Sequence, residues 1–172
     1  LNISYTISPR LNEYLSKIES LRKQTLLTPV SPATELKFKW EAIFNRTYCS
    51  LKLSGNPLKK NEMLKVLTEI THKKINSDQL EVIKYKKAQD YLSQNWLGSQ
   101  NPVNAQDIVD LHKIIGSGKL RIPRAGLQYL LDYLQARSEN PIIRAAIVNI
   151  EMGKMQLFSD HNSQISCLTP LL

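Results

Sequence analysis

The chain has 172 residues, and 42% of them are apolar, which suffices for one domain with a buried core. The formal net charge is +8, and the two cysteines, Cys49 and Cys167, lack the spacing of a metal site or a disulfide framework. This cysteine usage favours a reduced, cytoplasmic compartment. We expect no membrane partner, because no run approaches the roughly 20 apolar residues of a membrane span and no signal-peptide pattern is present.

Helices are predicted almost throughout, because apolar residues recur at spacings of three and four and strand-like alternation is missing. Ser8 and Pro9 predict the start of the first helix. A proline-containing linker separates it from a second helix, which we expect over residues 33–53 with an apolar stripe facing the core. Gly55 suits the left-handed position that follows such a helix.

The remaining elements are marked by caps and breakers of the same kind. Further helices are expected at about residues 60–71 and 77–96, from Asn104 to Ile115, from Pro123 past Leu134, from Asn140 past Ile150, and between Asn162 and Pro170. The glycines at 116 and 118 end one of them. Together these elements predict an all-α fold of about seven to eight helices.

Side chains that could hold a metal ion or act as a nucleophile are scattered. The histidines, His72, His112 and His161, share no short spacing with Cys, Asp or Glu that would build a zinc site. His112 lies on the apolar stripe of its helix, where a hydrogen-bonded core histidine is expected. Neither cysteine has an evident base. The positive charge accompanies no helix-turn-helix, zinc-finger or aromatic–basic pattern, so we do not expect a nucleic-acid partner.

The segment from Gln156 to Cys167 has the outline of a phosphate-binding loop followed by a helix. Phe158, Asp160 and Asn162 stand where an apolar anchor, a metal-binding carboxylate and a loop-shaping amide could lie. The residue chemistry alone also fits a polar connection between two helices, with Phe158 as its apolar plug. Both interpretations stay open on these residues alone.

Four segments in order resemble the Fic (filamentation induced by cAMP) family, also called Fic/DOC. Its members carry a helix with twin alanines, then H-P-F-x-D/E-G-N-G-R-x-x-R, then a second helix. Residues 140–146 are similar to the first helix, residues 156–167 to the motif, and residues 111–115 to the family's Leu-His-Lys helix. Residues 50–58 are similar to the inhibitory helix S-x-x-x-E-G-N of one class. The resemblance implies a Fic-like fold and protein AMPylation, a nucleotidyltransferase reaction that uses ATP and magnesium.

This chain departs from the family motif at the positions that carry its chemistry. Gln156 stands at the position of the family's general base, a histidine, and an amide does not accept a proton near neutral pH. The resemblance assigns nucleotide binding to a set that is degenerate here: Ser159, Asp160, His161, Asn162, Ser163, Gln164 and Cys167. His161 and Ser163 replace small residues, so their Cβ atoms are expected to oppose the phosphate-binding geometry. Gln164 and Cys167 replace arginines, and Asp160, the family's magnesium ligand, then has little to coordinate.

The inhibitory-like helix changes in step with the motif. The resemblance assigns it Ser50, Ser54, Gly55 and Asn56, and Ser54 replaces the family's glutamate, which pairs with the second motif arginine. Residues 118–123 lead almost directly into the next helix, so the flap hairpin that aligns a target in the family is expected to be shortened or missing.

The resemblance divides the chain into an N-terminal helical region, residues 1–58, and a Fic-like core, residues 59–172, within one compact unit. We expect this core to be truncated at its C-terminal end, because family members continue with more helices. The sequence leaves open whether the chain is a fragment.

We predict a Fic-like protein without adenylyltransferase activity and without a cofactor, which acts as an interaction or vestigial domain. The alternative is an active enzyme that transfers AMP from ATP, with magnesium, to a Ser, Thr or Tyr hydroxyl of a target and uses His161 as a displaced base. The target or partner protein and the formation of a homo-oligomer stay open. So does the choice between a selected pseudoenzyme and a decaying gene.

Overall fold

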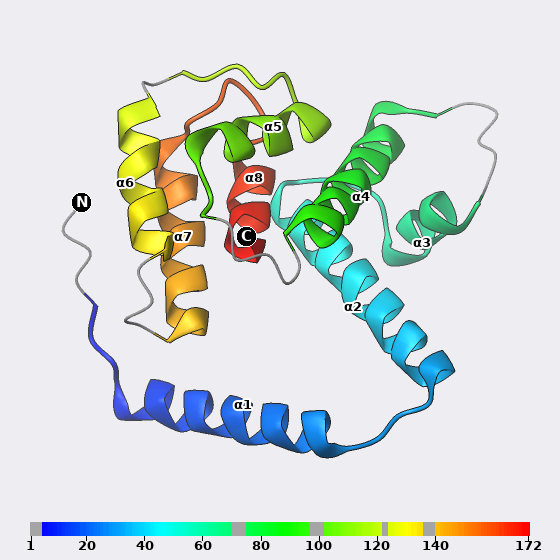
Figure 1. Ribbon diagram of the computed structural model, residues 1–172. Helices are drawn as coiled ribbons and strands as arrows, with labels where there is room; N and C mark the ends of the chain where they lie inside the picture. Colours follow the sequence, from blue (N-terminus) through cyan, green and yellow to red (C-terminus); the bar gives the residue numbers. More distant parts are fainter. Residues whose placement is uncertain (1–4, 70–74, 97–101, 122–123, 136–139) are drawn as a thin grey trace. The chain divides into compact units, whose positions relative to one another are not determined.

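The computed structural model describes residues 5–69, 75–96, 102–121, 124–135 and 140–172 (Figure 1). The described residues form helices connected by loops, and no strand occurs among them. The helices are α1 (Pro9–Leu27), α2 (Pro32–Leu53), α3 (Lys60–Thr68), α4 (Ser77–Asn95), α5 (Ala105–Ile115), α6 (Arg124–Gln135), α7 (Pro141–Met155), α8 (Asn162–Leu168) and a closing 3-10 turn, η1 (Thr169–Leu171). The predicted all-α fold class is confirmed.

Short-range capping sets the helix starts. The Ser8 hydroxyl accepts a hydrogen bond from Leu11 N, and the Asn140 side chain accepts one from Ile142 N. Asn104 accepts from two backbone N–H groups of the first turn of α5. Each bond satisfies a donor that a helix leaves free at its start. The Asn76 side chain caps α4 and accepts from Gln79 N.

The chain divides into two compact units, Leu1–Ala42 and Ile43–Leu172, with the division inside α2. In the first unit Leu15 is buried, but Ile18, Leu21 and Leu36 are 44%, 62% and 68% exposed. The prediction that the apolar stripe of α2 faces the core is therefore wrong at Leu36, because α1 and α2 pack little against each other. The division at residue 58 stays a prediction.

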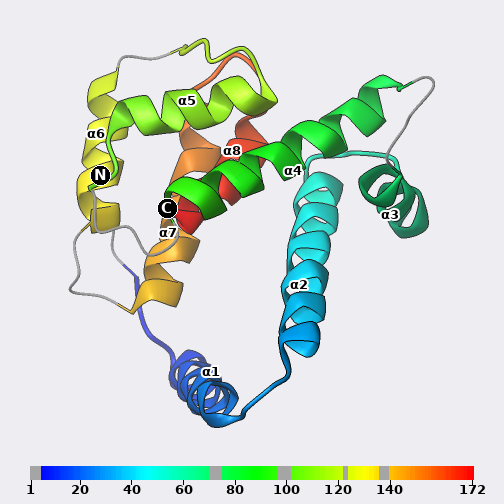
Figure 2. The same ribbon diagram turned by 45° about the vertical axis from the view of Figure 1, so that its right-hand side comes forward.

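The second unit contains nearly all of the described core. α8 lies against α7 and α4, α5 packs on α4, and α6 packs on α7 (Figure 1, Figure 2). The fully buried side chains come from all of these helices and from α2 and α3: Leu51, Met63, Val82, Tyr85, Ile108, Leu111, Leu127, Leu131, Val148 and Ile165. This packing holds the α7–α8 connection, which carries the motif, beside α5 (Figure 1). No helix in the described part of the chain has the length and apolarity to cross a membrane.

The segment predicted to hold a shortened flap hairpin pairs with the motif itself. Leu120 and Phe158 form an isolated antiparallel bridge. Arg121 N donates to Leu157 O at 2.7 Å, and Ser159 N donates to Lys119 O at 3.1 Å. The backbone groups of the described residues in this segment therefore bond the motif loop and do not form a separate hairpin. Residues 122–123 lie outside the described part.

Candidate functional site

The motif begins where α7 ends. Gln156 follows the last residue of that helix with a left-handed backbone, φ 47° and ψ 50°. Its side chain is exposed, and the amide Nε2 donates back to the carbonyl of Gly153. The position where the resembling family has its base therefore holds a neutral amide that is hydrogen-bonded to its own helix. Such a group offers no lone pair of useful basicity.

Phe158 and Asn162 close the loop through two hydrogen bonds, and both residues are buried. Asn162 Oδ1 accepts from Phe158 N at 2.8 Å, and Asn162 Nδ2 donates to Phe158 O at 2.8 Å. Phe158 is fully buried, and Asn162 is nearly so. The structure thus places these two residues in the roles expected of them, an apolar anchor and a loop-shaping amide.

His112 lies behind the loop as a fully buried, hydrogen-bonded core histidine. Gly118 N donates to His112 Nδ1 at 3.0 Å, so the proton of the neutral ring is on Nε2, which donates to Asp160 O at 2.9 Å. The ring stacks on Phe158 with centroids 3.8 Å apart. Burial lowers the pKa of His112, although the carbonyl and carboxylate of Asp160 act against it. The core role predicted from the sequence is confirmed.

Asp160, the expected magnesium ligand, directs its carboxylate at the turn after α5. Oδ1 accepts from the Ser117 hydroxyl at 3.3 Å and lies 3.3 Å from His112 Nε2. A Cβ added at Gly116 would lie 2.7 Å from this same oxygen, so only glycine permits the approach. Ser117 also lies 3.1 Å from the Ser159 hydroxyl. In the described part of the chain, no group of three or more metal-binding side chains occurs.

The sequence predicts only a helix end at Gly116 and no role for Ser117. Their contact with the motif spans more than forty residues of chain. No local pattern signals it.

His161 and Ser163 occupy the positions of the two small residues in the family motif. His161 adopts a left-handed backbone, φ 49° and ψ 26°, directly before α8. His161 adopts this conformation in spite of its Cβ, at a cost of roughly 1–2 kcal/mol, which the surrounding packing offsets. The expectation that the Cβ atoms at 161 and 163 oppose phosphate binding stays a prediction. Ser163 lies in the first turn of α8, and its hydroxyl is 3.2 Å from that of Ser54. The end of α2 therefore contacts the start of α8.

Gln164, at the first arginine position of the family motif, is buried in a polar bridge. Its side chain is 2% exposed, and its Nε2 donates to Glu81 Oε1 on α4. The other oxygen of Glu81 accepts from Asn56, the residue after Gly55 at the end of α2. One carboxylate thus joins three helices. Glu81 was not singled out from the sequence, where it is one of several charged residues on α4.

Cys167, at the second arginine position, is half-buried. Its Sγ is 3.7 Å from Asn149 Nδ2. Ser50 and Cys167 both lie beside the Tyr85 hydroxyl, and burial raises the pKa of Tyr85 far above its usual range. Ser54, at the position of the family's glutamate, bonds Ser163 rather than Cys167 among the hydrogen bonds of the described residues.

Solved structures of Fic-domain proteins share this fold. Fic-1 from C. elegans aligns with a TM-score of 0.79 and 20% identity, over 93% of this chain and 56% of that one. A Fic family protein from Desulfovibrio desulfuricans aligns with a TM-score of 0.77 and 17% identity, over 99% of this chain and 58% of that one. A Fic domain containing signaling protein from Bacteroides thetaiotaomicron aligns with a TM-score of 0.73 and 17% identity, over 88% of this chain and 70% of that one.

The chain thus spans little more than half the length of the first two proteins. No known sequence family and no curated protein matches it. At these identities the similarity establishes the fold, which is that of Fic domains.

Proposed function

We propose that this chain is a Fic-like protein without adenylyltransferase activity, which acts as an interaction or vestigial domain. The observation that carries the proposal is the side chain at the base position. Gln156 presents a neutral amide whose donor bonds Gly153 O. In the resembling family a histidine at this position deprotonates the target hydroxyl before it attacks the nucleotide. An amide cannot take that proton near neutral pH, so the first step is lost.

The positively charged side chains that would bind the phosphates of a nucleotide are also replaced. No Lys or Arg occurs in residues 156–167, and the two arginine positions hold Gln164 and Cys167. Gln164 bonds the carboxylate of Glu81, which puts an acidic group beside the start of α8. A triphosphate at this loop would meet that carboxylate without a guanidinium to neutralise its own charge. The residues present therefore do not fit a nucleotide.

The magnesium position is no better suited. Mg²⁺ in proteins is held by one or two carboxylates together with substrate phosphates and water. Asp160 is the single carboxylate of the motif, and its Oδ1 accepts from Ser117 and faces His112. Without phosphates at the loop, this one carboxylate does not make a magnesium site. We derive no catalytic step through the ion.

The end of α2 supports a structural role for the inhibitory-like helix. Ser54 bonds Ser163, and Asn56 bonds Glu81, which in turn bonds Gln164. These contacts hold α2 on α8 without the glutamate–arginine pair of the resembling class. These residues include no arginine that a bound nucleotide could engage, so we infer a fixed attachment rather than a regulatory one.

The test is transfer of AMP. The full chain is incubated with ATP labelled on its α-phosphate, magnesium and a cell extract, beside an active Fic enzyme as a positive control. We expect no labelled protein above the level of the Asp160→Asn variant. Labelling that the wild type gives and Asp160→Asn does not would overturn the proposal. Loss of that labelling in His161→Gln would then identify His161 as the displaced base.

Nucleotide binding gives a second, independent measurement. Calorimetry of the full chain with millimolar ATP or ADP and magnesium should show no saturable heat. Saturable binding that weakens in Asp160→Asn would contradict the argument from Gln164 and Cys167, even if no AMP were transferred.

A further inference from the structure

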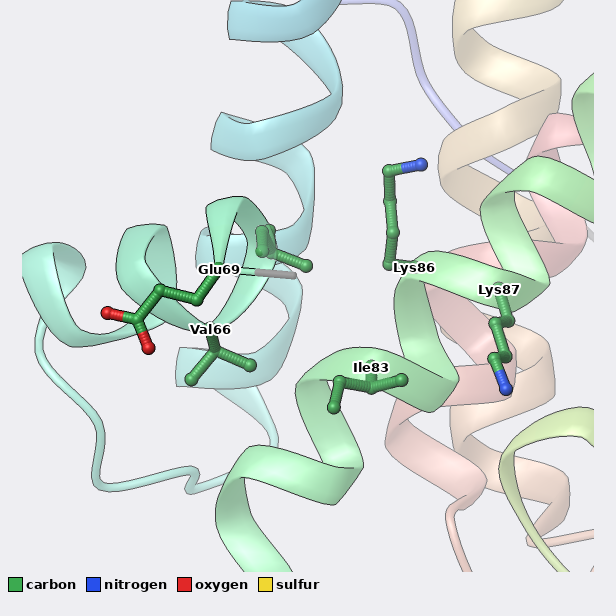
Figure 3. Close-up of a pocket in the computed structure, with 6 residues that line it drawn as sticks. Val66, Glu69, Ile83, Lys86 and Lys87 are labelled. Carbon is green, nitrogen blue, oxygen red and sulfur yellow. The ribbon is translucent and has the colours of Figure 1, made fainter. Parts of the chain in front are cut away.

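A pocket of about 280 Å³ lies between α3 and α4 in the second unit and shares no residue with the motif loop (Figure 3). It is lined by Val66, Leu67, Glu69, Ile83, Lys86 and Lys87. Pockets for drug-sized ligands measure roughly 300–1,000 Å³, so this one suits a smaller molecule.

The floor of the pocket is apolar and rigid. We use "pocket floor" for Val66, Leu67 and Ile83, which come from both helices. Val66 is 5% exposed and belongs to the core of the second unit, and the other two are half-buried and pack against that core. A ligand that covers this floor removes apolar surface from water, which favours binding in proportion to the area covered.

Lys86 extends the apolar wall. Its side chain is 22% exposed, and its ammonium group pairs with Asp90 one turn further along α4. The methylene stem therefore faces the pocket while the charge is compensated elsewhere. Lys86 adds surface for an apolar ligand and little net charge.

Lys87 supplies the uncompensated charge. It is exposed, and none of the ion pairs in the described ranges of the chain includes it. In Figure 3 the carboxylate of Glu69, the residue after α3, points away from the two lysines on α4. The rim is therefore positive along α4, and Glu69 does not neutralise Lys87.

We propose that the α3–α4 pocket binds a small amphiphile, with its apolar body on the pocket floor and an anionic head group at Lys87. A lysine ammonium is a point charge without the planar geometry of arginine, so it binds a carboxylate or a phosphate head group equally well. A cationic head group gains nothing at Lys87.

The test uses four probes with one octyl chain: octanoate, octyl phosphate, octan-1-ol and octylamine. Each is titrated into the full chain below its micelle concentration, and binding is followed by amide chemical shifts. Shift changes should centre on α3 and α4. At least one of the two anions should bind about three- to fivefold more tightly than the alcohol, the gain expected of one exposed ion pair. Whichever anion binds more tightly identifies the head group.

Two variants distinguish the effect of the Lys87 charge from that of other positive charge on α4. Lys87→Gln should reduce the affinity for the anions to that for the alcohol. Lys84→Gln removes a lysine of the same helix that does not line the pocket, and it should leave all affinities unchanged. Equal binding of octylamine, shifts that centre outside α3 and α4, or an unaltered anion preference in Lys87→Gln would each overturn the proposal. The result is independent of the AMP-transfer test, because the two sites share no residue.

Discussion

His112 makes the stability of the protein depend on pH. The side chain is fully buried, and burial lowers its pKa below the ordinary value of 6.5. In the unfolded chain the pKa returns to about 6.5, so between the two values the unfolded state binds more protons than the folded state. The free energy of unfolding should therefore have its full His112 contribution above about pH 6.5 and lose it as the pH falls below that value.

Urea unfolding followed by circular dichroism at intervals from pH 8 to pH 5 measures this dependence. His112→Gln should lower the stability at every pH and flatten the decline, because the variant has no titrating group at this position. His161→Gln removes the half-buried neighbour of the His112 ring and should keep most of the decline. An equal decline in wild type and His112→Gln would show that other groups cause it.

At the scale of single residues, the sequence predicted those roles that depend on a residue's own helix or loop. His112 on an apolar stripe, Phe158 as anchor and Asn162 as loop amide are of this kind. Glu81 was missed, because its partners lie 25 and 83 residues away in the chain. A backbone angle is equally hard to foresee when packing enforces it, and His161 shows this.

The end of α2 is an element whose geometry depends on one glycine. Asn56 N donates to Leu51 O, and Gly55 N donates to Lys52 O, which together form a Schellman cap. Gly55 has φ +90°, and nothing lies within 4 Å of an added Cβ. Gly55→Ala should therefore lower the free energy of unfolding by about 1–2 kcal/mol through backbone strain alone.

Gly153 provides the matched control for this prediction. It lies inside α7, its backbone is not left-handed, and an added Cβ again meets nothing within 4 Å. Gly153→Ala should raise the free energy of unfolding by about 0.5–1 kcal/mol, because alanine loses less backbone entropy in a helix. Chemical denaturation of both variants measures the two changes in the free energy of unfolding. Similar effects of the two substitutions would contradict the assigned role of Gly55.

Helix starts and ends were predictable because capping is local. Ser8, Asn104 and Asn140 each bond a residue two or three positions away. The outward position of Ile18 and Leu21 on α1 was not predictable, since a helical stripe shows that one face is apolar but not what covers it. Element type therefore followed from the sequence, while burial depended on distant parts of the chain.

At the scale of the whole molecule, the fold class followed from helical periodicity along the entire chain. The order of the motif-like segments predicted the Fic-like arrangement, which similarity in three dimensions bears out. The pairing of residues 119–121 with the loop was not foreseen beyond a shortened hairpin. Such pairing depends on where α5 and α7 come to lie, and that is a property of the packed unit.

The uneven distribution of the core predicts which part of the chain folds by itself. Among the described buried apolar side chains, Leu15 is the single one that lies before Ile43. A fragment of residues 43–172 should therefore unfold cooperatively, with a free energy of unfolding within about 2 kcal/mol of the full chain, the value of one buried leucine. Urea unfolding of both chains, followed by circular dichroism, measures the difference.

A second fragment, residues 59–172, tests whether the second half of α2 is needed for the stability of the second unit. It also lacks Phe44 and Leu51, which are buried in the second unit, and Asn56, which bonds Glu81. Loss of two large buried side chains costs about 2–5 kcal/mol each, a large share of the stability of a small domain. This fragment should fail to unfold cooperatively. If it were instead as stable as residues 43–172, the second half of α2 would be an appendage of the core, and its contacts with α8 could not hold the fixed attachment inferred for it.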